Sequence, residues 1–194
     1  MFDFRLPGLK ESGYFYQKNF ALKTILSGQQ VGLTVKRLAQ QVLENHLQLK
    51  DTVIIGIQPR GVYLSDQVVD ELKTLVDPSS ISYGKLDITF YRDDVRKEFH
   101  NANKTDIPFS IENKKVIIID DVLYTGRTIR AALDALLDFG RPAKVELCVL
   151  VDRRFSREFP IQPDYVGRAI DTAISQKVKV YWSEKDGKDE VVLL

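Results

Sequence analysis

Hydrophobic residues along the chain follow two alternating patterns, one typical of buried strands and one typical of amphipathic helices. Short aliphatic, largely β-branched runs occur at 52–57, 116–120 and 145–151, and such runs are typical of strands that are buried on both faces. Between these runs, apolar residues recur every three to four positions, as they do along one face of a helix. This alternation of strands and helices predicts an α/β domain built on a parallel sheet.

Three helices are expected from the apolar spacing. The first starts at Ser27, which is placed to form a capping box with Gln30. The second follows a break at residues 59–61, and the third stops at Gly140, just before Pro142. The predicted inner faces consist of Val31, Val35, Leu38 and Val42; of Leu64, Val68, Leu72 and Leu75; and of Ile129, Leu133, Leu136 and Leu137.

The remaining segments show weaker patterns. Residues 86–92 alternate between apolar and polar, which predicts a strand with one less buried side. Residues 93–106 are charged and without a period, which predicts a mobile loop. The pattern from 152 to 176 is irregular, and residues 178–182 and 191–194 are expected to form a closing hairpin.

Composition narrows the possible classes of protein. A length of 194 residues suits one domain, and 28 basic against 27 acidic residues give no overall positive field that would indicate nucleic acid. No apolar run approaches the roughly 20 residues that span a bilayer, and the N-terminus lacks the order of a signal peptide. We therefore expect a cytoplasmic protein with no membrane partner, and with one cysteine and two histidines no zinc site is expected.

The stretch from Val116 to Ile129 carries the clearest chemical signal. Four aliphatic residues lead to two adjacent carboxylates, Asp120 and Asp121, and then to a Thr-Gly-Arg-Thr turn at 125–128. Ligands of parallel sheets bind beyond the carboxyl ends of the strands, and a glycine turn that opens a helix suits a phosphate monoester. The carboxylates would then accept hydrogen bonds from a ribose or attract Mg²⁺. An isolated acid pair often only caps a helix, but the ordered run favours a binding site.

This stretch resembles the phosphoribosyl-diphosphate (PRPP) signature of type I phosphoribosyltransferases. With further motifs it resembles the PyrR family, whose members are bifunctional pyrimidine-operon attenuation proteins and uracil phosphoribosyltransferases. The resemblance covers residues 26–194 and leaves residues 1–25 as an aromatic-rich N-terminal extension. The motifs that carry it are Leu86–Asp94, Val122–Leu136, Asp138–Pro142, Val149–Arg153 and Asp164–Arg168.

The resemblance implies a fold and an activity. The fold would be that of type I phosphoribosyltransferases, an α/β domain with a mainly parallel twisted sheet flanked by helices and a small hood at about 152–182. The activity would be a pentosyl (glycosyl) transfer of pyrimidine salvage, in which uracil and PRPP give UMP and diphosphate, with Mg²⁺ as cofactor. The implied partners are PRPP, uracil or UMP, further copies of the chain in a homo-oligomer, and an mRNA leader in transcription regulation.

The resemblance also implies roles for individual residues. Asp120 and Asp121 would hold the ribose and Mg²⁺, and together with Arg60 they are the catalytic candidates. A cis peptide bond between Gln58 and Pro59 would be inexpensive in the turn that precedes Arg60. The other implied roles are PRPP binding by Val122, Leu123, Tyr124, Thr125, Gly126, Arg127 and Thr128, diphosphate binding by Pro59, Arg60, Gly61 and Arg92, and base binding by Arg153 and Val178.

Three alternatives remain open at this point. One is an RNA-binding attenuator with vestigial catalysis, and the chain departs from the family at Gln40 and at residues 154–156, where family members carry histidines. Another is a purine phosphoribosyltransferase. A receiver-like signalling domain is disfavoured because its acidic pair follows the first strand and not a later one. The basic patch available to RNA would consist of Lys36, Arg37, Arg154, Arg157 and Arg168.

Overall fold

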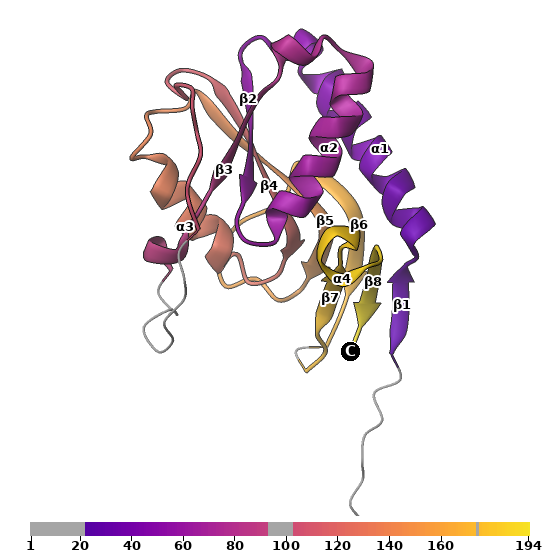
Figure 1. Ribbon diagram of the computed structural model, residues 1–194. Coiled ribbons are helices and arrows are strands. Elements are labelled where there is room, and N and C mark those ends of the chain that lie inside the picture. Colours follow the sequence, from indigo (N-terminus) through magenta and orange to yellow (C-terminus); the bar gives the residue numbers. More distant parts are fainter. Residues whose placement is uncertain (1–21, 93–102, 174) are drawn as a thin grey trace, which may run out of the picture.

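Five parallel strands form the central sheet of the protein (Figure 1). The computed structural model describes residues 22–92, 103–173 and 175–194. The predicted extension therefore lies mostly outside the described residues, as do residues 93–102 of the loop predicted at 93–106. The strand order across the sheet is β3 (Ser82–Leu86), β2 (Thr52–Ile57), β4 (Lys115–Leu123), β5 (Lys144–Arg154) and β6 (Tyr165–Asp171).

The three strands predicted from aliphatic runs are confirmed. Every residue of β2 is buried, and β4 and β5 are each longer than their apolar run. Successive side chains of these strands enter two separate hydrophobic clusters, one on each face of the sheet. Burial on both faces explains why the runs lack an apolar–polar alternation.

Two helices cover one face of the sheet and a third covers the other. Helices α1 (Gly28–Asn45) and α2 (Gly61–Leu75) belong to one cluster, and α3 (Arg127–Leu136) belongs to the second. The predicted capping box between Ser27 and Gln30 is present. The predicted inner faces are correct except at helix ends and edges, where three residues are exposed: Leu75, Leu133 and Leu137.

The strand predicted at 86–92 is wrong, because the chain leaves the sheet after Leu86. Strand β3 lies earlier, at Ser82–Leu86, and Thr89–Tyr91 forms a single 3₁₀ turn. The Asp87 carboxylate accepts hydrogen bonds from the backbone N–H groups of Thr89, at 2.6 Å, and of Asn103. Such local bonds from an aspartate compete with a strand ladder, and here they end it.

The irregular stretch at 152–176 contains a strand that the pattern did not reveal. Strand β6 pairs in parallel with β5, and Tyr165 is its one fully buried residue. Since β6 lies at the edge of the sheet, its residues other than Tyr165 are half-buried or exposed and carry no clear hydrophobic period. An edge position thus explains why this strand was missed.

A small antiparallel sheet lies near the carboxyl ends of the parallel strands (Figure 1). It consists of β1 (Lys23–Leu26), β8 (Glu190–Leu193) and β7 (Val178–Tyr181), in that order. The predicted hairpin is confirmed, and its connection contains the short helix α4 (Ser183–Asp186). Trp182 at the end of β7 is fully buried and stacks near Tyr63 of α2, with ring centroids 6.3 Å apart. This contact fixes the small sheet against the main domain.

Within the described ranges, no helix combines the length and the apolar character needed to cross a membrane.

A glycine at the start of α2 brings that helix close to β4. A Cβ atom at Gly61 would lie 2.6 Å from the carbonyl oxygen of Ile119 and 2.9 Å from the Cα of Asp120. Because these neighbours are backbone atoms of a central strand, they cannot move aside cheaply. We expect Gly61→Ala to lower the free energy of unfolding by about 1–3 kcal/mol, measured by urea denaturation.

The matched control is Gly32→Ala in α1, where nothing lies within 4 Å of the added Cβ. This change should raise the free energy of unfolding by about 0.5–1 kcal/mol, because alanine favours a helix interior over glycine. Equal effects of the two substitutions would contradict the close packing assigned to Gly61.

Candidate active site

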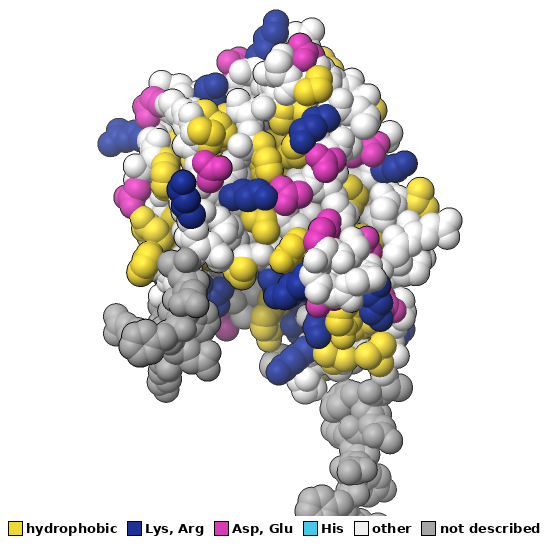
Figure 2. Space-filling model, viewed as in Figure 1, with side chains coloured by type: hydrophobic (Ala, Val, Ile, Leu, Met, Phe, Trp, Pro, Cys, Tyr) yellow, Lys and Arg dark blue, Asp and Glu magenta, His cyan; other side chains and the backbone are white. Residues whose placement is uncertain are grey.

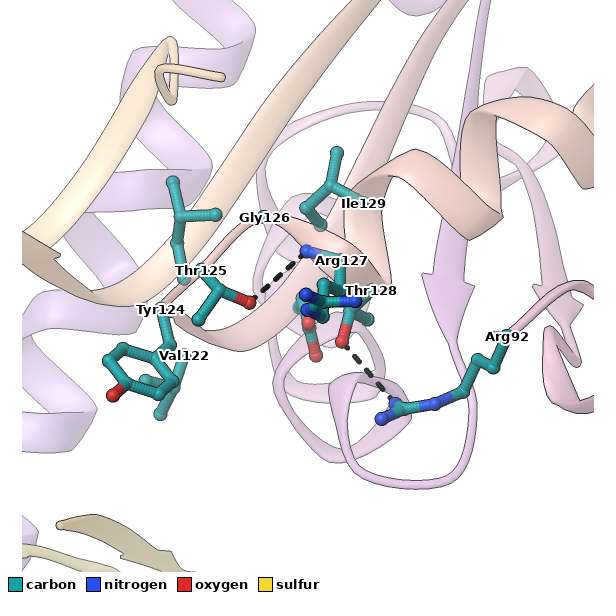
Figure 3. Close-up of a pocket in the computed structure, with 10 residues that line it drawn as sticks. Arg92, Val122, Tyr124, Thr125, Gly126, Arg127, Thr128 and Ile129 are labelled. Carbon is teal, nitrogen blue, oxygen red and sulfur yellow. Dashed lines mark hydrogen bonds between the residues drawn. The ribbon is translucent and has the colours of Figure 1, made fainter. Parts of the chain in front are cut away.

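A pocket of about 270 Å³ opens where β4 ends and α3 begins (Figure 3). Arg92 reaches toward Thr128 from one side of this pocket and Tyr124 lies on the other. The structure thus gathers in one place the whole predicted phosphate loop, one of the two acids and one predicted diphosphate residue. The lining residues are Arg92, Asp120, Val122, Leu123, Tyr124, Thr125, Gly126, Arg127, Thr128 and Ile129.

The turn between β4 and α3 is shaped for close approach of its backbone to a ligand. Gly126 has a φ of 92°, in the left-handed region that favours glycine. The hydroxyl of Thr125 accepts a hydrogen bond from the Arg127 N–H at 3.4 Å, and α3 starts at Arg127 (Figure 3). The first N–H groups of a helix have no partner within the helix and favour an anion. This geometry provides donors for a phosphate group.

The two acids lie within β4, where the strand loses one of its neighbours. The predicted strand ended at Asp120, but β4 continues to Leu123, and its pairing with β2 ends at Ile119. Asp120 and Asp121 are only 6% and 7% exposed. Where β2 turns away, the start of α2 takes its place beside β4, because Gly61 lies close to the backbone of Ile119 and Asp120.

Successive residues of a strand point to opposite faces of a sheet, and this separates the two carboxyl groups. Asp120 lines the pocket next to α3. Asp121 lies toward α2, where its Oδ2 accepts a hydrogen bond from the Nε of Arg60 at 3.1 Å. The structure therefore places only Asp120 in the pocket and gives Asp121 a protein partner.

The environment of Asp120 disfavours its charged form. Burial, followed by the nearby charge of Asp121, raises the pKa of Asp120 from 3.8 to about 8. The backbone N–H of Asp121, which donates to Oδ1 of Asp120 at 2.9 Å, opposes this rise, as do the charges of Arg92 and Arg60. Burial also raises the pKa of Asp121, and the Arg60 guanidinium is the main group that opposes it.

Arg60 connects the acid pair to the small sheet. Besides its bond to Asp121, its guanidinium donates to the backbone carbonyl of Val180 in β7. The preceding Gln58–Pro59 peptide bond is cis, as predicted, and the Gln58 side chain donates to the carbonyl of Lys104 at 2.8 Å. In this arrangement the predicted diphosphate turn at 59–61 is held next to Asp121.

Arg92, the other predicted diphosphate residue, lies with the phosphate loop and not with this turn. Its Nη1 is 3.5 Å from the Thr128 hydroxyl (Figure 3). Arg60 and Arg92 both act on the charge of Asp120, so they lie within electrostatic reach of one carboxyl group. The two cations thus approach the same acid from different elements.

Arg153, one of the two predicted base contacts, stacks on the ring of Tyr124, with the guanidinium carbon 3.8 Å from the ring centroid. It also donates to the Thr172 hydroxyl at 3.1 Å and to the carbonyl of Gln176 at 2.9 Å, and burial lowers its pKa. The other predicted base contact, Val178, is the first residue of β7 and is half-buried against the core. Arg153 therefore joins the phosphate loop to the segment that leads into β7.

The basic residues assigned to an RNA patch have different surroundings. Arg37 donates to the carbonyls of Val166 and Gly167, and Arg157 points behind the phosphate loop. Lys36 and Arg168 are exposed on α1 and β6, which pack together. Figure 2 shows basic side chains gathered around the small sheet, while both signs of charge are interspersed over the rest of this face.

Two features of this site were not found from the sequence. Trp182 is buried near Asp121, and its indole N–H makes no hydrogen bond within the described residues. Arg157 contacts the phosphate loop, but sequence analysis placed it with the surface arginines. No local pattern distinguishes this arginine from its neighbours Arg153 and Arg154, so only the tertiary structure reveals its contacts.

The carboxyl group of Asp120 fits a Mg²⁺ ion that would be bound together with a substrate. In the described part of the chain, no group of three or more His, Cys, Asp or Glu side chains could hold a metal. Mg²⁺ commonly binds through one or two carboxylates together with substrate phosphates. Asp120, which lines the pocket, would supply a carboxylate of this kind.

Comparison with known proteins identifies the family. The phosphoribosyl transferase domain family matches residues 21–185. The bifunctional protein PyrR of Desulfosudis oleivorans is 48% identical over 171 residues, which cover 87% of this chain and 94% of that protein. The chain belongs to the PyrR family. A second member, from Enterococcus faecalis strain V583, is 46% identical over 158 residues and covers 81% of this chain and 88% of its own length.

Solved structures show the same fold at lower identity. A hypoxanthine phosphoribosyltransferase of Trypanosoma cruzi has a TM-score of 0.63 at 18% identity, covering 89% of this chain and 95% of that one. A hypoxanthine-guanine phosphoribosyltransferase of Bacillus anthracis has a TM-score of 0.61 at 22% identity, with coverage of 78% and 84%. The predicted type I phosphoribosyltransferase fold is thus confirmed for this PyrR family member.

The raised pKa of Asp120 predicts how stability depends on pH. Between pH 3.8 and about pH 8 the folded protein binds more protons at this group than the unfolded protein does, so the free energy of unfolding falls as pH rises through that window. Asp120→Asn removes the titrating carboxyl group and with it this fall in the free energy of unfolding. We expect its stability relative to wild type to grow from pH 5 to pH 8, by at most about 1.4 kcal/mol per pH unit.

Urea denaturation at four pH values measures the difference. Asp134→Asn is the control, because it removes a carboxylate from the exposed face of α3, where Asp134 pairs with Arg130. A stability difference between Asp120→Asn and wild type that stays flat with pH would contradict the raised pKa.

Proposed function

We propose that this protein transfers the phosphoribosyl group of PRPP to uracil, forming UMP and diphosphate. The observation that carries the proposal is that the start of α3, the loop hydroxyls and Asp120 all face one pocket. A phosphate-binding turn beside a buried acid suits a sugar phosphate, because the anion and the sugar hydroxyls need different groups at fixed separation. Membership of the PyrR family supports uracil as the acceptor.

In the proposed reaction the bond from the anomeric carbon to diphosphate breaks, a bond from that carbon to N1 of uracil forms, and the proton of N1 is released to solvent. The 5′-phosphate would bind at the start of α3, with hydrogen bonds from the hydroxyls of Thr125 and Thr128. Asp120 would accept a hydrogen bond from the ribose and favour the positive charge that develops at the anomeric carbon. Asp121 is proposed to hold Arg60 in position at the far side of Asp120.

Arg60 and Arg92 would stabilise the negative charge of the departing diphosphate. Both lie within electrostatic reach of Asp120, which places positive charge beside the reacting centre. Asp120 would help to hold Mg²⁺, which would supply Lewis-acid stabilisation of the leaving group.

The pyrimidine is proposed to lie between the phosphate loop and the small sheet. Arg153 supports this placement, because it stacks on Tyr124 and binds the segment leading to Val178. We propose that the region from about 152 to 182, which contains these residues, acts as the hood. The purine enzymes among the solved structures are less than 25% identical and support the fold alone.

One assay tests the enzyme and its base preference together. PRPP-dependent turnover is measured with uracil, hypoxanthine, guanine and orotate, and uracil should be the preferred acceptor. Asp120→Asn combined with Asp121→Asn should lower kcat about a hundredfold or more, because preorganised electrostatic groups at the reacting centre are lost. Circular dichroism should show an unchanged fold.

The charge-matched control for this double variant is Asp70→Asn combined with Asp134→Asn. Both residues are exposed on helices, where they pair with Lys73 and Arg130. The control should keep wild-type kcat. A double variant of the acid pair that turns over uracil at the wild-type rate would refute the role proposed for these carboxyl groups, and preference for a purine would refute the acceptor.

We also propose that an oligomer of the chain, in the cytoplasm, binds a pyrimidine-operon mRNA leader. The relatives are named bifunctional proteins, and Lys36 and Arg168 are exposed on neighbouring elements. With a net charge of +1, one chain offers no broad basic surface, so local patches of two subunits would have to combine. The buried thiol of Cys148 suits a reducing compartment.

Gel-shift titrations with the organism's own leader RNA, at several salt concentrations and with UMP added, test this second function. Binding should weaken steeply with salt, and Lys36→Ala with Arg168→Ala should reduce both the affinity and the salt dependence. Lys50→Ala with Lys115→Ala is the control, because these lysines are exposed at the opposite, amino end of the sheet. Absence of RNA binding at low salt would refute this second function and leave only the proposed enzyme activity.

A further inference from the structure

We propose that Arg157 is a positioning residue that orients the peptide planes of the phosphate loop from behind. The inference rests on the proposed binding of the 5′-phosphate at 124–128 and concerns how the protein prepares that site. Arg157 is remote in sequence from the loop and lies in the connection between β5 and β6. Its side chain is 20% exposed, so it is neither a surface residue nor part of the pocket lining.

The first step of the argument is the contact between Arg157 and the loop. Its Nη1 group donates to the backbone carbonyl of Tyr124 and lies 3.3 Å from that of Leu123. These are consecutive carbonyls, and they belong to the last residue of β4 and to the residue after it. Arg157 therefore acts on the backbone at the point where the strand becomes the loop.

The neighbours of Arg157 continue this pattern along the loop. The backbone N–H groups of Glu158 and Phe159 donate to the carbonyl of Thr125, at 2.9 and 3.2 Å. The carbonyls of Leu123, Tyr124 and Thr125 thus all point toward the segment 157–159. Three consecutive peptide planes of the loop are fixed by one short stretch of chain.

Peptide geometry converts these contacts into a property of the pocket. In a planar trans peptide unit, the carbonyl of one residue and the N–H of the next point in opposite directions. Carbonyls that face the segment 157–159 therefore turn the N–H groups of Tyr124, Thr125 and Gly126 the other way. These three residues line the pocket, so the same contacts aim their N–H groups toward the proposed phosphate.

The fixed position of the guanidinium makes this orientation stable. Its Nε donates to the carbonyl of Ile161 at 3.0 Å and its Nη1 to that of Arg153 at 2.9 Å. Nη2 pairs with the Asp152 carboxylate, which is buried at 9% exposure. Since this carboxylate balances the charge of Arg157, the side chain acts through hydrogen-bond geometry and not as a direct ligand of the phosphate.

Packing on the same side of the loop supports the role. A Cβ atom at Gly126 would lie 3.3 Å from both Ile161 and Phe159, so the segment after Arg157 is in close contact with the tightest point of the turn. Arg127, the first residue of α3, pairs with Glu158. Residues 157–161 therefore pack behind the loop, from the end of β4 to the start of α3.

Lysine cannot replace arginine in this position. The acceptors lie in different directions around a planar group, and an ammonium at one point cannot reach all of them. Without the guanidinium, the carbonyls of Leu123 and Tyr124 would lack their buried donor, and their peptide planes would be free to rotate. A carbonyl rotated into the pocket would repel a phosphate.

Affinity for ligands with and without a phosphate group tests the inference. Titration calorimetry measures UMP, and NMR titration measures uridine, against wild type, Arg157→Ala and Arg157→Lys. We expect both variants to bind UMP about tenfold to a hundredfold more weakly and to bind uridine as wild type does. Added guanidinium should restore part of the UMP affinity of Arg157→Ala. It should not increase the UMP affinity of the wild-type protein.

Arg154→Ala is the matched control, since Arg154 lies three residues earlier and pairs with the exposed Asp171. It should bind UMP and uridine like wild type. Thermal melting shows whether each variant folds. If Arg157→Ala does not melt cooperatively, Arg157→Lys and Asp152→Asn are compared instead, and both should lose UMP affinity while keeping that for uridine.

The outcomes separate this inference from the proposed function. Wild-type protein that binds neither UMP nor PRPP would refute the proposed function itself. Wild-type binding of UMP with unchanged affinity in the Arg157 variants would overturn the positioning role and leave the enzyme standing. Equal losses for UMP and uridine, without rescue by guanidinium, would also overturn it, because a general structural role does not distinguish the two ligands.

Discussion

Two adjacent carboxyl groups buried at the end of a central strand impose a free-energy cost that the surrounding structure must offset. Strand alternation sends Asp120 and Asp121 to opposite faces, so each needs its own compensation. Asp121 is balanced by Arg60, which donates a hydrogen bond to it. Asp120 keeps a raised pKa and faces the pocket. The free-energy cost of burying its charged form is therefore left for a bound ligand to offset. The small sheet, the turn at 59–61 and the close contact of Gly61 all serve this arrangement.

Much of the fold could be predicted from the sequence because burial leaves a strong pattern. Strands β2, β4 and β5 are buried on both faces and stand out as apolar runs, and the capping box marks the start of α1. The edge strand β6 leaves no such signal, and β3 was misplaced because Asp87 ends the strand with local hydrogen bonds. Hydrophobic periodicity reports burial, so it gives little signal in an edge strand such as β6, where one residue is buried.

The residues of the candidate site likewise divide into those that the sequence reveals and those that only the fold brings together. The seven loop residues from Val122 to Thr128 are contiguous, so a motif locates them and the pocket contains them all. The roles of Arg157 and Trp182 depend on segments that are distant in sequence and meet only in the folded chain. The sequence also could not show that Asp121 would bind Arg60 and leave Asp120 alone in the pocket, because that depends on where β2 turns away from β4.

The double contact of Arg60 makes the two ends of the site thermodynamically dependent on each other. One guanidinium holds both Asp121 and the carbonyl of Val180 in β7. Any anion that draws this guanidinium away must also break its hydrogen bond to Val180, and any ligand that moves β7 changes how readily Arg60 can leave. Such a linkage is reciprocal, so each ligand alters the affinity for the other by the same factor. The first ligand to bind would thus set the affinity with which the second is held.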